Sequence, residues 1–384
     1  MHKIHYCRLC LYPDTKPHLF FNNKGICSAC INFNKRSKID WINRKESFIK
    51  LVKTIKRNSN ANHDCIIPVS GGKDSTYQVI RCLEYGLKPL CVTATTDDLS
   101  LLGRSNLDNI KKLGVDCIEV TVNPNIRRKI NKFTLKIVGD ISWSEHLLIF
   151  TIPVRIAINF NIKLIVWGEN SQNEYGGPEN ESKKNILDNR WLQEFGGLGG
   201  LRVRDLVDSD EFKKEDLLLY QYPSVKELKK SKVMGIFLGH YFPWDGYENK
   251  IIAEKHGFKA WPKDIEGSLL NYENIDNYQH GIHDYFCFLK FGFGRATAQA
   301  SILIRRNRIL RSEALKKIKE MEGKFPWSYL DKKLSDILKS IEMTQEEFID
   351  TCDKFTNKKI FHINKDGSLL KDNTLSLKKI NYDN

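Results

Sequence analysis

The sequence of 384 residues contains no apolar run near the roughly 18 residues that a membrane-spanning helix needs. Its first ten residues, MHKIHYCRLC, lack the apolar core of a signal peptide, and no internal repeat is visible. These absences predict a cytoplasmic protein with no membrane insertion. The length allows two domains, or one large domain with additions.

Two common nucleotide-binding motifs are also missing. A Walker A loop needs Gly-x4-Gly-Lys-Ser/Thr, but Asp74 follows Lys73 and residue 67 is Ile. The fingerprint G-x-G-x-x-G is absent as well. The chain has instead SGGKDST, residues 70–76, between an apolar run and a helix-like segment.

This turn predicts a phosphate site. Consecutive small residues let backbone N–H groups approach an anion, and a helix N-terminus adds partial positive charge. Lys73 supplies a full charge, and Asp74 is expected to help hold Mg²⁺. The expected phosphate cradle is Ser70, Gly71, Gly72, Lys73, Asp74, Ser75 and Thr76.

The net charge of +14 is unevenly distributed. Residues 1–60 carry 13 Lys or Arg against 3 Asp or Glu, and residues 301–320 carry 7 against 2. Two interpretations stay open, namely binding of an anionic ligand or partner and simple solvation of basic faces.

Four of the ten cysteines form two close pairs, Cys7-x2-Cys10 and Cys27-x2-Cys30. This spacing is typical of a zinc ribbon, and four thiolates close the metal shell, which predicts a structural Zn²⁺. A segment of about 35 residues has too little core to fold without such a site. Iron with the same ligands, two disulfides or unpaired thiols remain alternatives.

Apolar runs alternate with helix-like segments through the middle of the chain. Strands are expected at 65–69, 89–95, 116–122, 163–167 and 234–238. Helices are expected between them at 76–85, 103–113, 126–138 and 144–159, the last interrupted by Pro153. The pattern predicts an α/β fold with a doubly wound, mainly parallel sheet. The expected domains are a zinc ribbon at 1–35, a helical linker at 36–62, a nucleotide-binding domain at 63–300 and a basic helical region at 301–384.

The turn resembles the PP-loop of the ATP pyrophosphatases, whose pattern SGGxDS is matched at Ser70, Gly71, Gly72, Asp74 and Ser75. The resemblance implies a PP-loop/HUP-like (adenine nucleotide alpha hydrolase-like) domain that uses ATP and Mg²⁺. Such enzymes adenylate a substrate oxygen, release pyrophosphate and let a nucleophile displace AMP. It further implies that the strand after the first helix contacts the nucleoside, which places Thr93, Ala94, Thr95 and Asp97 there.

The four-cysteine ribbon, SGGKDST, LIVWGEN, YFCFLKFGFGRAT and the basic C-terminal region together resemble the N-acetyl sugar amidotransferases. These bacterial enzymes serve lipopolysaccharide, O-antigen and nonulosonic-acid biosynthesis. The resemblance implies an AMP-forming carbon–nitrogen ligase whose substrate is an acetamido sugar, either a UDP-amino sugar or a nonulosonic acid. ATP would adenylate the amide oxygen, and ammonia would displace AMP to give the acetamidino sugar.

Further site residues are expected in two of these segments. Lys290 and Arg295 bracket a Gly-rich turn and are candidates for binding phosphates. Gly168, Glu169 and Asn170 follow a strand, at the edge where open α/β sheets bind ligands. Glu169 and Asn170 are expected to position the amide or ammonia. Asn173, Tyr175 and Gly176 belong to the same expected substrate loop.

No source of ammonia is visible in the chain. No cysteine lies in a Gly-x-Cys-x-Gly elbow, and residue 2 is His. The resemblance implies a separate glutaminase partner, similar to the glutaminase and cyclase subunits that make imidazole glycerol phosphate. The main rival interpretation is a PP-loop tRNA-modifying enzyme, although no two cysteines after Cys30 lie within three residues. A zinc-ribbon scaffold that binds nucleotide only as a regulator is a third.

Overall fold

The computed structural model describes residues 4–58, 61–177, 186–187 and 198–380. Its centre is a sheet in the order β3-β2-β1-β4-β6-β5. The strands are β1 (Cys65–Pro68), β2 (Pro89–Ala94), β3 (Asp116–Val120), β4 (Leu164–Trp167), β5 (Ile186–Leu187) and β6 (Met234–Phe237). Only β5 pairs antiparallel within this sheet as described, so the predicted mainly parallel sheet is confirmed.

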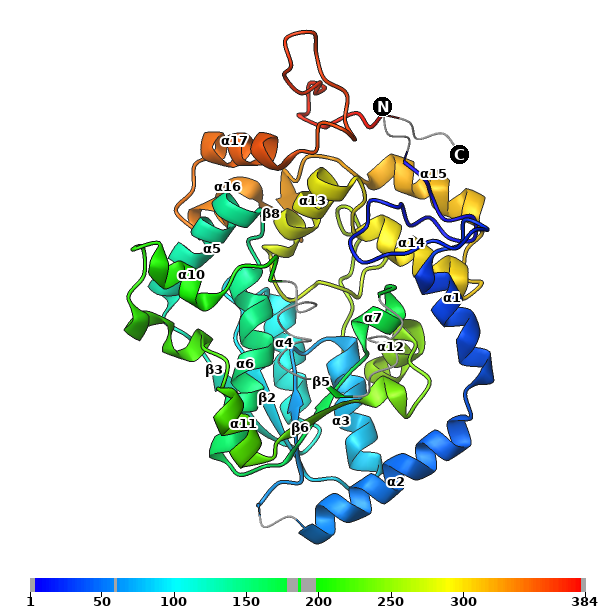
Figure 1. Cartoon of the computed structure of the whole chain (residues 1–384), viewed down its shortest axis with the longest axis vertical. Helices are drawn as coiled ribbons and strands as arrows, with labels where there is room; N and C mark the ends of the chain where they lie inside the picture. The colour runs from blue at the N-terminus through cyan, green and yellow to red at the C-terminus, as the bar shows by residue number, and fades with distance from the viewer. Residues whose placement is uncertain (1–3, 59–60, 178–185, 188–197, 381–384) are drawn as a thin grey trace.

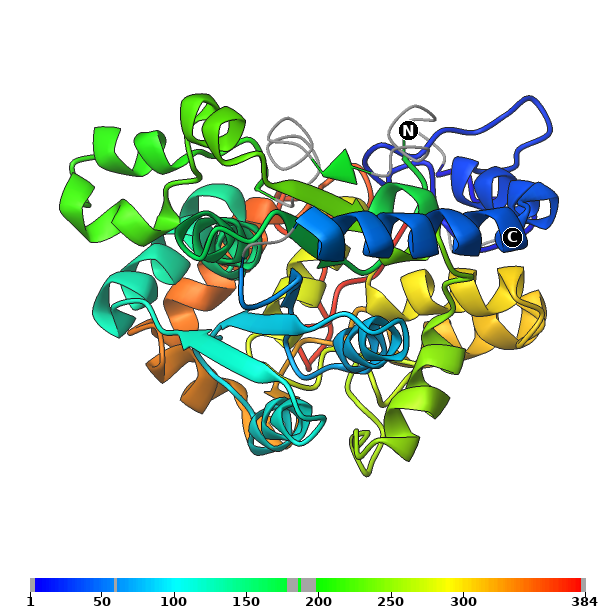
Figure 2. The ribbon, with the colours of Figure 1, turned by 90° about the horizontal axis from the view of Figure 1, so that it is seen from below.

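Helices cover both faces of this sheet. The main ones are α3 (Lys73–Glu84), α4 (Leu101–Lys111), α5 (Pro124–Val138), α6 (Trp143–Asn159) and α12 (Gly246–Lys255). Cys65 and Ile67 of β1 pack with α3 and α4, whereas Ile66 faces α5 and α6. Figure 2 shows α6 on the opposite side of the strands from α3 and α4. The sheet is doubly wound because both faces of its strands are apolar.

Two helices differ from the sequence expectation at particular residues. The helix α4 begins before Gly103, since the Ser100 side chain caps it by accepting a hydrogen bond from the Gly103 N–H at 2.8 Å. The helix α6 runs through Pro153, so the expected interruption is wrong. Ile152 and Val154 on either side of this proline are buried, and their core packing keeps the helix continuous.

The N-terminal module packs in two places: its ribbon lies against later helices, whereas Phe48 and Val52, in the helix after the ribbon, are buried against the start of the sheet. It contains α1 (Ser28–Lys35), the 3-10 turn η1 (Arg36–Lys38) and α2 (Trp41–Asn58). Figure 1 shows the described part of the ribbon beside α14 (Arg295–Arg305) and α15 (Arg311–Met321). The rings of Tyr12 and Phe293 meet edge to face at 5.9 Å. The ribbon is therefore packed into the body of the molecule.

The segment between β4 and α12 adds shorter elements around the sheet. They are α7 (Ser171–Glu174), α10 (Val203–Asp208), η2 (Lys214–Tyr220), α11 (Val225–Ser231) and η3 (Leu238–His240). Residues 178–185 and 188–197, which follow the expected substrate loop in sequence, lie outside the described residues.

The C-terminal region has a hydrophobic core of its own. It contains α13 (His280–Phe291), α14, α15, α16 (Leu334–Lys339) and α17 (Gln345–Phe355), with a small hairpin of β7 (Ser328–Tyr329) and β8 (Lys332–Lys333). Phe286, Phe348 and Phe361 are almost fully buried at its centre. This core extends back to Ala253 and also includes Leu135 of α5, so the C-terminal region is joined to the sheet domain by shared packing.

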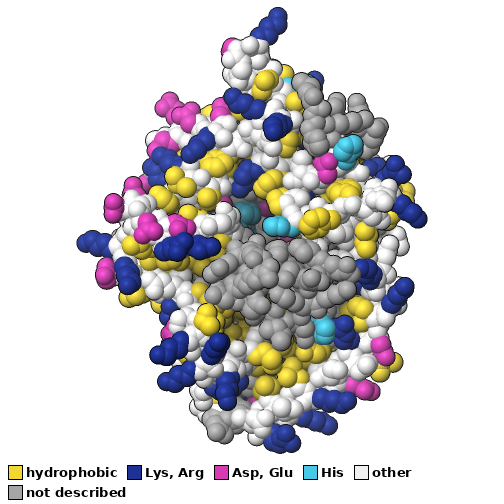
Figure 3. Space-filling view, viewed as in Figure 1, with side chains coloured by type: hydrophobic (Ala, Val, Ile, Leu, Met, Phe, Trp, Pro, Cys, Tyr) yellow, Lys and Arg dark blue, Asp and Glu magenta, His cyan; other side chains and the backbone are white. Residues whose placement is uncertain are grey.

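The surface is mixed in charge. In Figure 3, Lys and Arg side chains cover the lower margin of the face, around α2 and α11, and acidic side chains gather near α10 and α17. None of the helices in the described ranges has both the length and the hydropathy needed to cross a bilayer.

Candidate active site

The SGGKDST turn joins β1 to α3 at the carboxyl end of the sheet. Gly71 has a φ of +86°, and a Cβ there would lie 2.6 Å from the backbone nitrogen of Leu107 in α4. Only glycine fits this position. Ser75 and Thr76 each donate a side-chain hydrogen bond to the Gly72 carbonyl at 3.0 Å, which fixes the first turn of α3. The turn thus holds the helix N-terminus at the edge of a cleft.

The cleft has a volume of about 460 Å³, within the range of ligand pockets, which is roughly 300–1,000 Å³. It lies where β2 and β4 flank β1, the point at which the strand order reverses and α/β sheets bind ligands. Of the residues expected from the sequence, the structure brings to its walls Ser70, Gly71, Gly72, Lys73, Asp74, Ser75, Thr93, Ala94, Thr95, Gly168, Glu169, Tyr175 and Arg295.

Lys73 is buried and bound by carboxylates. Its Nζ lies 2.7 Å from Asp74 Oδ2 and 3.3 Å from Glu273 Oε1. Burial lowers the pKa of Lys73, but Asp74 and Glu273 outweigh burial and the net shift is upward, so the side chain is a fixed cation. Asn249 of α12 donates to Asp74 Oδ1 at 2.8 Å and holds the carboxylate in place.

Glu169 follows β4 on the wall of the cleft. Burial and the nearby Asp74 carboxylate raise its pKa to about 7, so it can gain or lose a proton at neutral pH. Tyr175 also faces the cleft, and burial raises the pKa of its phenol, which stays protonated. A carboxyl group that titrates near the working pH is suited to proton transfer.

Arg295, the first residue of α14, lines the cleft. Its guanidinium lies 3.1 Å from Asp284 Oδ1. Lys290 lies elsewhere. Its Nζ donates to the Gly139 carbonyl at 3.0 Å and to that of Val138 at 3.4 Å, at the end of α5. The expected contact of Lys290 with phosphates does not fit this position, because the side chain caps a helix C-terminus outside the cleft.

Two other expected residues also lie beside the cleft rather than on its wall. Thr76 is fully buried under the turn. Asp97 is held by Arg127, whose Nε lies 2.6 Å from its Oδ1, and by Asn131. Burial raises the pKa of Asp97 to about 6, although Arg127 lowers it.

The loop after Glu169 is anchored to the ribbon. Gly176 has a φ of +83°, and a Cβ there would meet Leu19 at 2.7 Å and Ala29 at 2.8 Å. Gly176 is therefore a packing residue, and the expected contact with substrate does not fit it. Asn170 is buried, and the side chain of Asn173 lies outside the described residues. Glu174 accepts from Arg36 at 2.8 Å and from Arg306, which ties α7 to the ribbon and to α14.

The four ribbon cysteines converge. Their sulfur atoms all lie within 4.8 Å of one another, with Cys7 and Cys30 at 3.8 Å and Cys10 and Cys27 at 3.7 Å. A tetrahedral Zn²⁺ with bonds of about 2.3 Å separates its sulfur ligands by about 3.8 Å, which these distances match. The cysteines are buried and none is in a disulfide, so the pattern fits a closed structural metal site.

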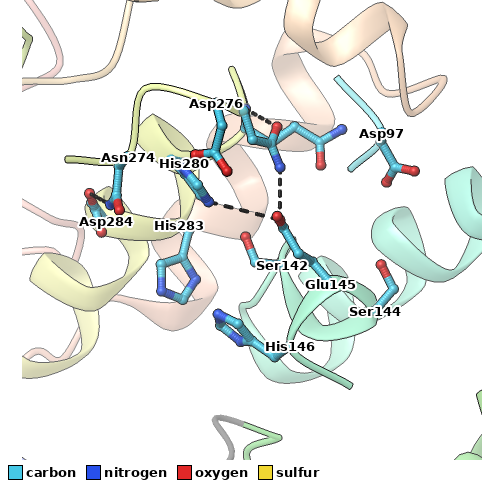
Figure 4. Close-up of polar contacts among 12 residues, drawn as sticks. Asp97, Ser142, Ser144, Glu145, His146, Asn274, Asp276, His280, His283 and Asp284 are labelled. Atoms are coloured by element: carbon cyan, nitrogen blue, oxygen red, sulfur yellow. Dashed lines mark hydrogen bonds and ion pairs between the residues drawn. The ribbon is translucent and has the colours of Figure 1, made fainter. Parts of the chain in front are cut away.

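A second polar group on the cleft wall was not expected from the sequence. Glu145 and His146 come from the first turn of α6, and Asp276 and His280 come from the segment that leads into α13. Figure 4 shows Glu145, Asp276 and His280 turned toward one another, with His146 beside His283. Asn277 donates to Glu145 Oε2 at 2.8 Å. The cluster of Asn, Asp and His in NYENIDNYQHGIHD, residues 271–284, was the available signal.

Comparison with known proteins finds that part of the sequence matches a protein-family model. Residues 266–374 match the family described as "LPS biosynthesis protein WbpG-like, C-terminal domain". This range contains Glu273, Asp276, His280 and Arg295 of the cleft. No curated protein matches the sequence significantly.

Two solved structures show a weaker likeness. The NH3-dependent NAD synthetase from Campylobacter jejuni, solved with nitrate, has 14% identity and a TM-score of 0.28, over 50% of this chain and 93% of that chain. The NMN synthetase from Francisella tularensis has 12% identity and a TM-score of 0.27, over 59% and 99%. The fold assignment rests on the sheet order and the turn at residues 70–76. The match over residues 266–374 supports the resemblance drawn from the sequence at the level of LPS biosynthesis.

Proposed function

We propose that the chain is an ATP-dependent amidotransferase that converts the acetamido group of a bacterial sugar to an acetamidino group. One observation carries the proposal. A single cleft joins the SGGKDST turn, the Glu169 loop and residues of the LPS-biosynthesis domain. A nucleotide-binding turn and a domain of polysaccharide biosynthesis therefore contribute to the same site.

The turn fits a nucleotide phosphate. The N-terminus of α3 faces the cleft, Gly71 and Gly72 leave the backbone open, and Ser70 and Ser75 contribute hydroxyl groups. Thr93, Ala94 and Thr95 at the end of β2 would contact the nucleoside. Asp74 would hold Mg²⁺ bound to ATP, and this ion would neutralise phosphate charge.

The reaction would take place in two steps. The amide oxygen attacks the α-phosphorus of ATP, and the bond to pyrophosphate breaks. Ammonia then attacks the amide carbon, and AMP leaves with the former amide oxygen. Lys73 and Arg295 are cations on the walls of the same cleft and would stabilise the negative charge that develops on phosphate.

Glu169 would handle a proton of the amide or of ammonia. Its carboxyl group has a pKa of about 7 and lies on the same wall as Asp74. After ammonia attacks, its nitrogen carries an extra proton. This proton must leave before AMP departs and the amidine forms. A carboxyl group with this pKa can accept that proton and be ionised again in the next cycle.

The sugar would be a UDP-linked amino sugar or a nonulosonic acid of O-antigen or lipopolysaccharide biosynthesis. Ammonia would come from a separate glutaminase, with or without a cyclase-like subunit. Ammonium salts would replace this partner in a test with the purified chain.

The experiment uses the full chain with ATP, Mg²⁺, ammonium chloride and a panel of acetamido sugars. We expect AMP, pyrophosphate and a sugar lighter by the difference between an oxygen atom and an NH group. The matched control is the same panel without ammonium, in which no amidine forms. AMP formation that requires added tRNA and no sugar would contradict the proposal and favour the tRNA-modifying alternative.

A further inference from the structure

The polar group around His280 lies in a cleft whose charge is opposite to that of the whole protein. The cleft is lined by five carboxylates, Asp74, Glu145, Glu169, Glu273 and Asp276, and by two permanent cations, Lys73 and Arg295. Both cations are already paired, Lys73 with Asp74 and Glu273, and Arg295 with Asp284. The chain as a whole carries a net charge of +14. A cleft with this lining attracts small cations.

The ring of His280 lies between two of these carboxylates. Its Nε2 is 3.8 Å from Glu145 Oε2, and its Nδ1 is 3.7 Å from Asp276 Oδ1. Both separations are longer than a hydrogen bond, and Nδ1 is buried without a hydrogen-bond partner. An imidazole nitrogen without a hydrogen-bond partner can accept a proton from a ligand bound beside the two carboxylates.

Carboxylates from two elements face the ring of His280. Glu145 faces it from α6 and Asp276 from the loop before α13, whereas Asp284 of α13 is turned to Asn274 and Arg295. Burial would raise the pKa of Glu145, but His280, Arg127 and His146 outweigh it and lower that pKa. Glu145 is thus an anion at neutral pH.

The group does not have the shape of a metal site. Among the described residues, only the four ribbon cysteines bring three or more ligand atoms close enough to hold an ion. Carboxylates that are spread around a histidine suit a larger ion that donates several hydrogen bonds, and ammonium is such an ion.

We propose that Glu145 and Asp276 bind ammonium in the cleft and that His280 takes its proton. This inference rests on the proposed function. The N–H bond of ammonium breaks, the proton goes to an imidazole nitrogen of His280, and the electron pair stays on the nitrogen of ammonia. That pair then forms the bond to the adenylated amide carbon, and AMP leaves with the C–O electron pair. His280 is on this account a catalytic residue for the second step.

The test compares two nucleophiles at neutral pH. Ammonia is then mostly ammonium, whereas hydroxylamine is uncharged and needs no removal of a proton before it attacks. For His280→Gln we expect kcat/KM for ammonium chloride to fall about a hundred-fold, the lower part of the range for general base catalysis, while hydroxylamine reacts as with the wild type. The ammonium activity of this variant should also rise with pH more steeply than that of the wild type.

The control is His283→Gln. His283 lies on the same helix one turn later and pairs with Asp140 at 2.9 Å, and it does not line the cleft. We expect this variant to use ammonium as the wild type does. An equal loss with both nucleophiles in His280→Gln, or an equal loss with ammonium in both variants, would overturn the proposal by showing a structural role.

A binding measurement needs no sugar. In histidine-labelled protein, ammonium chloride should shift the ring resonance of His280, assigned by its loss in His280→Gln, and sodium chloride at the same ionic strength should not. Equal shifts with both salts would contradict the proposal. Failure of the proposed function is distinguishable, because the wild type would then form no AMP with either nucleophile.

Discussion

The ammonium nitrogen of Lys73 lies 3.3 Å from a carboxylate oxygen of Glu273, so the SGGKDST turn forms an ion pair with the segment that matches the WbpG-like family model, residues 266–374. Both side chains are largely buried, with 7% and 18% of their surface exposed. Removing one member of a buried pair leaves the other without compensation. The contact lets the C-terminal segment influence the geometry of a turn that follows the central strand of the sheet.

This contact gives the first prediction. Lys73→Met should lower the free energy of unfolding by about 3 kcal/mol, the usual cost of breaking a buried ion pair. In a Glu273→Gln background the same change should cost less, by roughly 1–3 kcal/mol, because the partner is already neutral. Urea denaturation of the four proteins measures the coupling. Lys111→Met, at an exposed pair, is the control, and additive effects at 73 and 273 would refute the coupling.

A second prediction concerns Asp74 and ATP. Asp74→Ala should abolish pyrophosphate release, because the carboxylate proposed to hold Mg²⁺ is lost from the turn, while the circular dichroism spectrum stays that of a folded protein. The matched control is Asp208→Ala, an exposed residue of α10, which should release pyrophosphate normally. Full activity of Asp74→Ala would rule out the assignment of the turn.

A third prediction follows from the raised pKa of Glu169. Its carboxyl group has a pKa of about 7 in the folded protein and an ordinary value of 4.5. Between these values the folded state binds more protons than the unfolded state, so its contribution to stability decreases as the pH rises. Stability should therefore fall from about pH 4.5 to about pH 7 less steeply in Glu169→Gln than in the wild type. Denaturation at several pH values tests this, and identical profiles would contradict the shift.

The same variant tests a role in catalysis. Glu169→Gln should lower kcat for amidine formation and remove the part of the pH–rate profile that reports a group with a pKa of about 7. Glu174→Gln would be a poor control, since Glu174 binds Arg36 and Arg306. Glu248→Gln, an exposed position on α12, is better. A profile that is unchanged in Glu169→Gln would assign the proton transfer to another group.

A fourth prediction separates Arg295 from Lys290. Arg295→Lys should slow pyrophosphate release, because a lysine cannot keep the forked contact with Asp284 and reach the cleft in the same way. Lys290→Met should leave the KM for ATP unchanged and lower stability by about 1–3 kcal/mol, since it removes a charged donor from the Gly139 carbonyl. A large rise in the KM for ATP in Lys290→Met would restore Lys290 to the phosphate site.

A fifth prediction concerns the ribbon. Elemental analysis should find one Zn²⁺ per chain, and its removal by a chelator should lower the melting temperature and the activity together. Activity is lost because Gly176 packs on Ala29, so the loop that carries Glu169 and Tyr175 depends on the ribbon. Cys30→Ser should reproduce this effect, whereas Cys117→Ser, outside the ribbon, should retain the metal. Iron in place of zinc would change the metal but not the structural role.

Much of the fold could be predicted from the sequence because its signals are local. The five parallel strands are short apolar runs between helical segments, and the turn at 70–76 has small residues where the backbone must stay open. The ribbon cysteines were predictable for the same reason, since each pair lies within four residues.

The rest of the site depends on contacts between distant segments. Glu273 reaches Lys73, and His280 reaches Glu145, only after the C-terminal region has packed against the sheet. Lys290 was misplaced because its neighbours in sequence do not reveal which face of α13 it occupies. Gly176 looked like a ligand-facing residue, yet its role is to let the loop approach Ala29.

The most direct test of the central claim follows the oxygen atom. An acetamido sugar with an isotopic oxygen label in its amide carbonyl is incubated with the full chain, ATP, Mg²⁺ and ammonium, and the AMP is analysed by mass spectrometry. Adenylation of the amide oxygen predicts that the label is recovered in AMP and lost from the sugar. Unlabelled AMP, with the label in phosphate, pyrophosphate or water, would contradict the account.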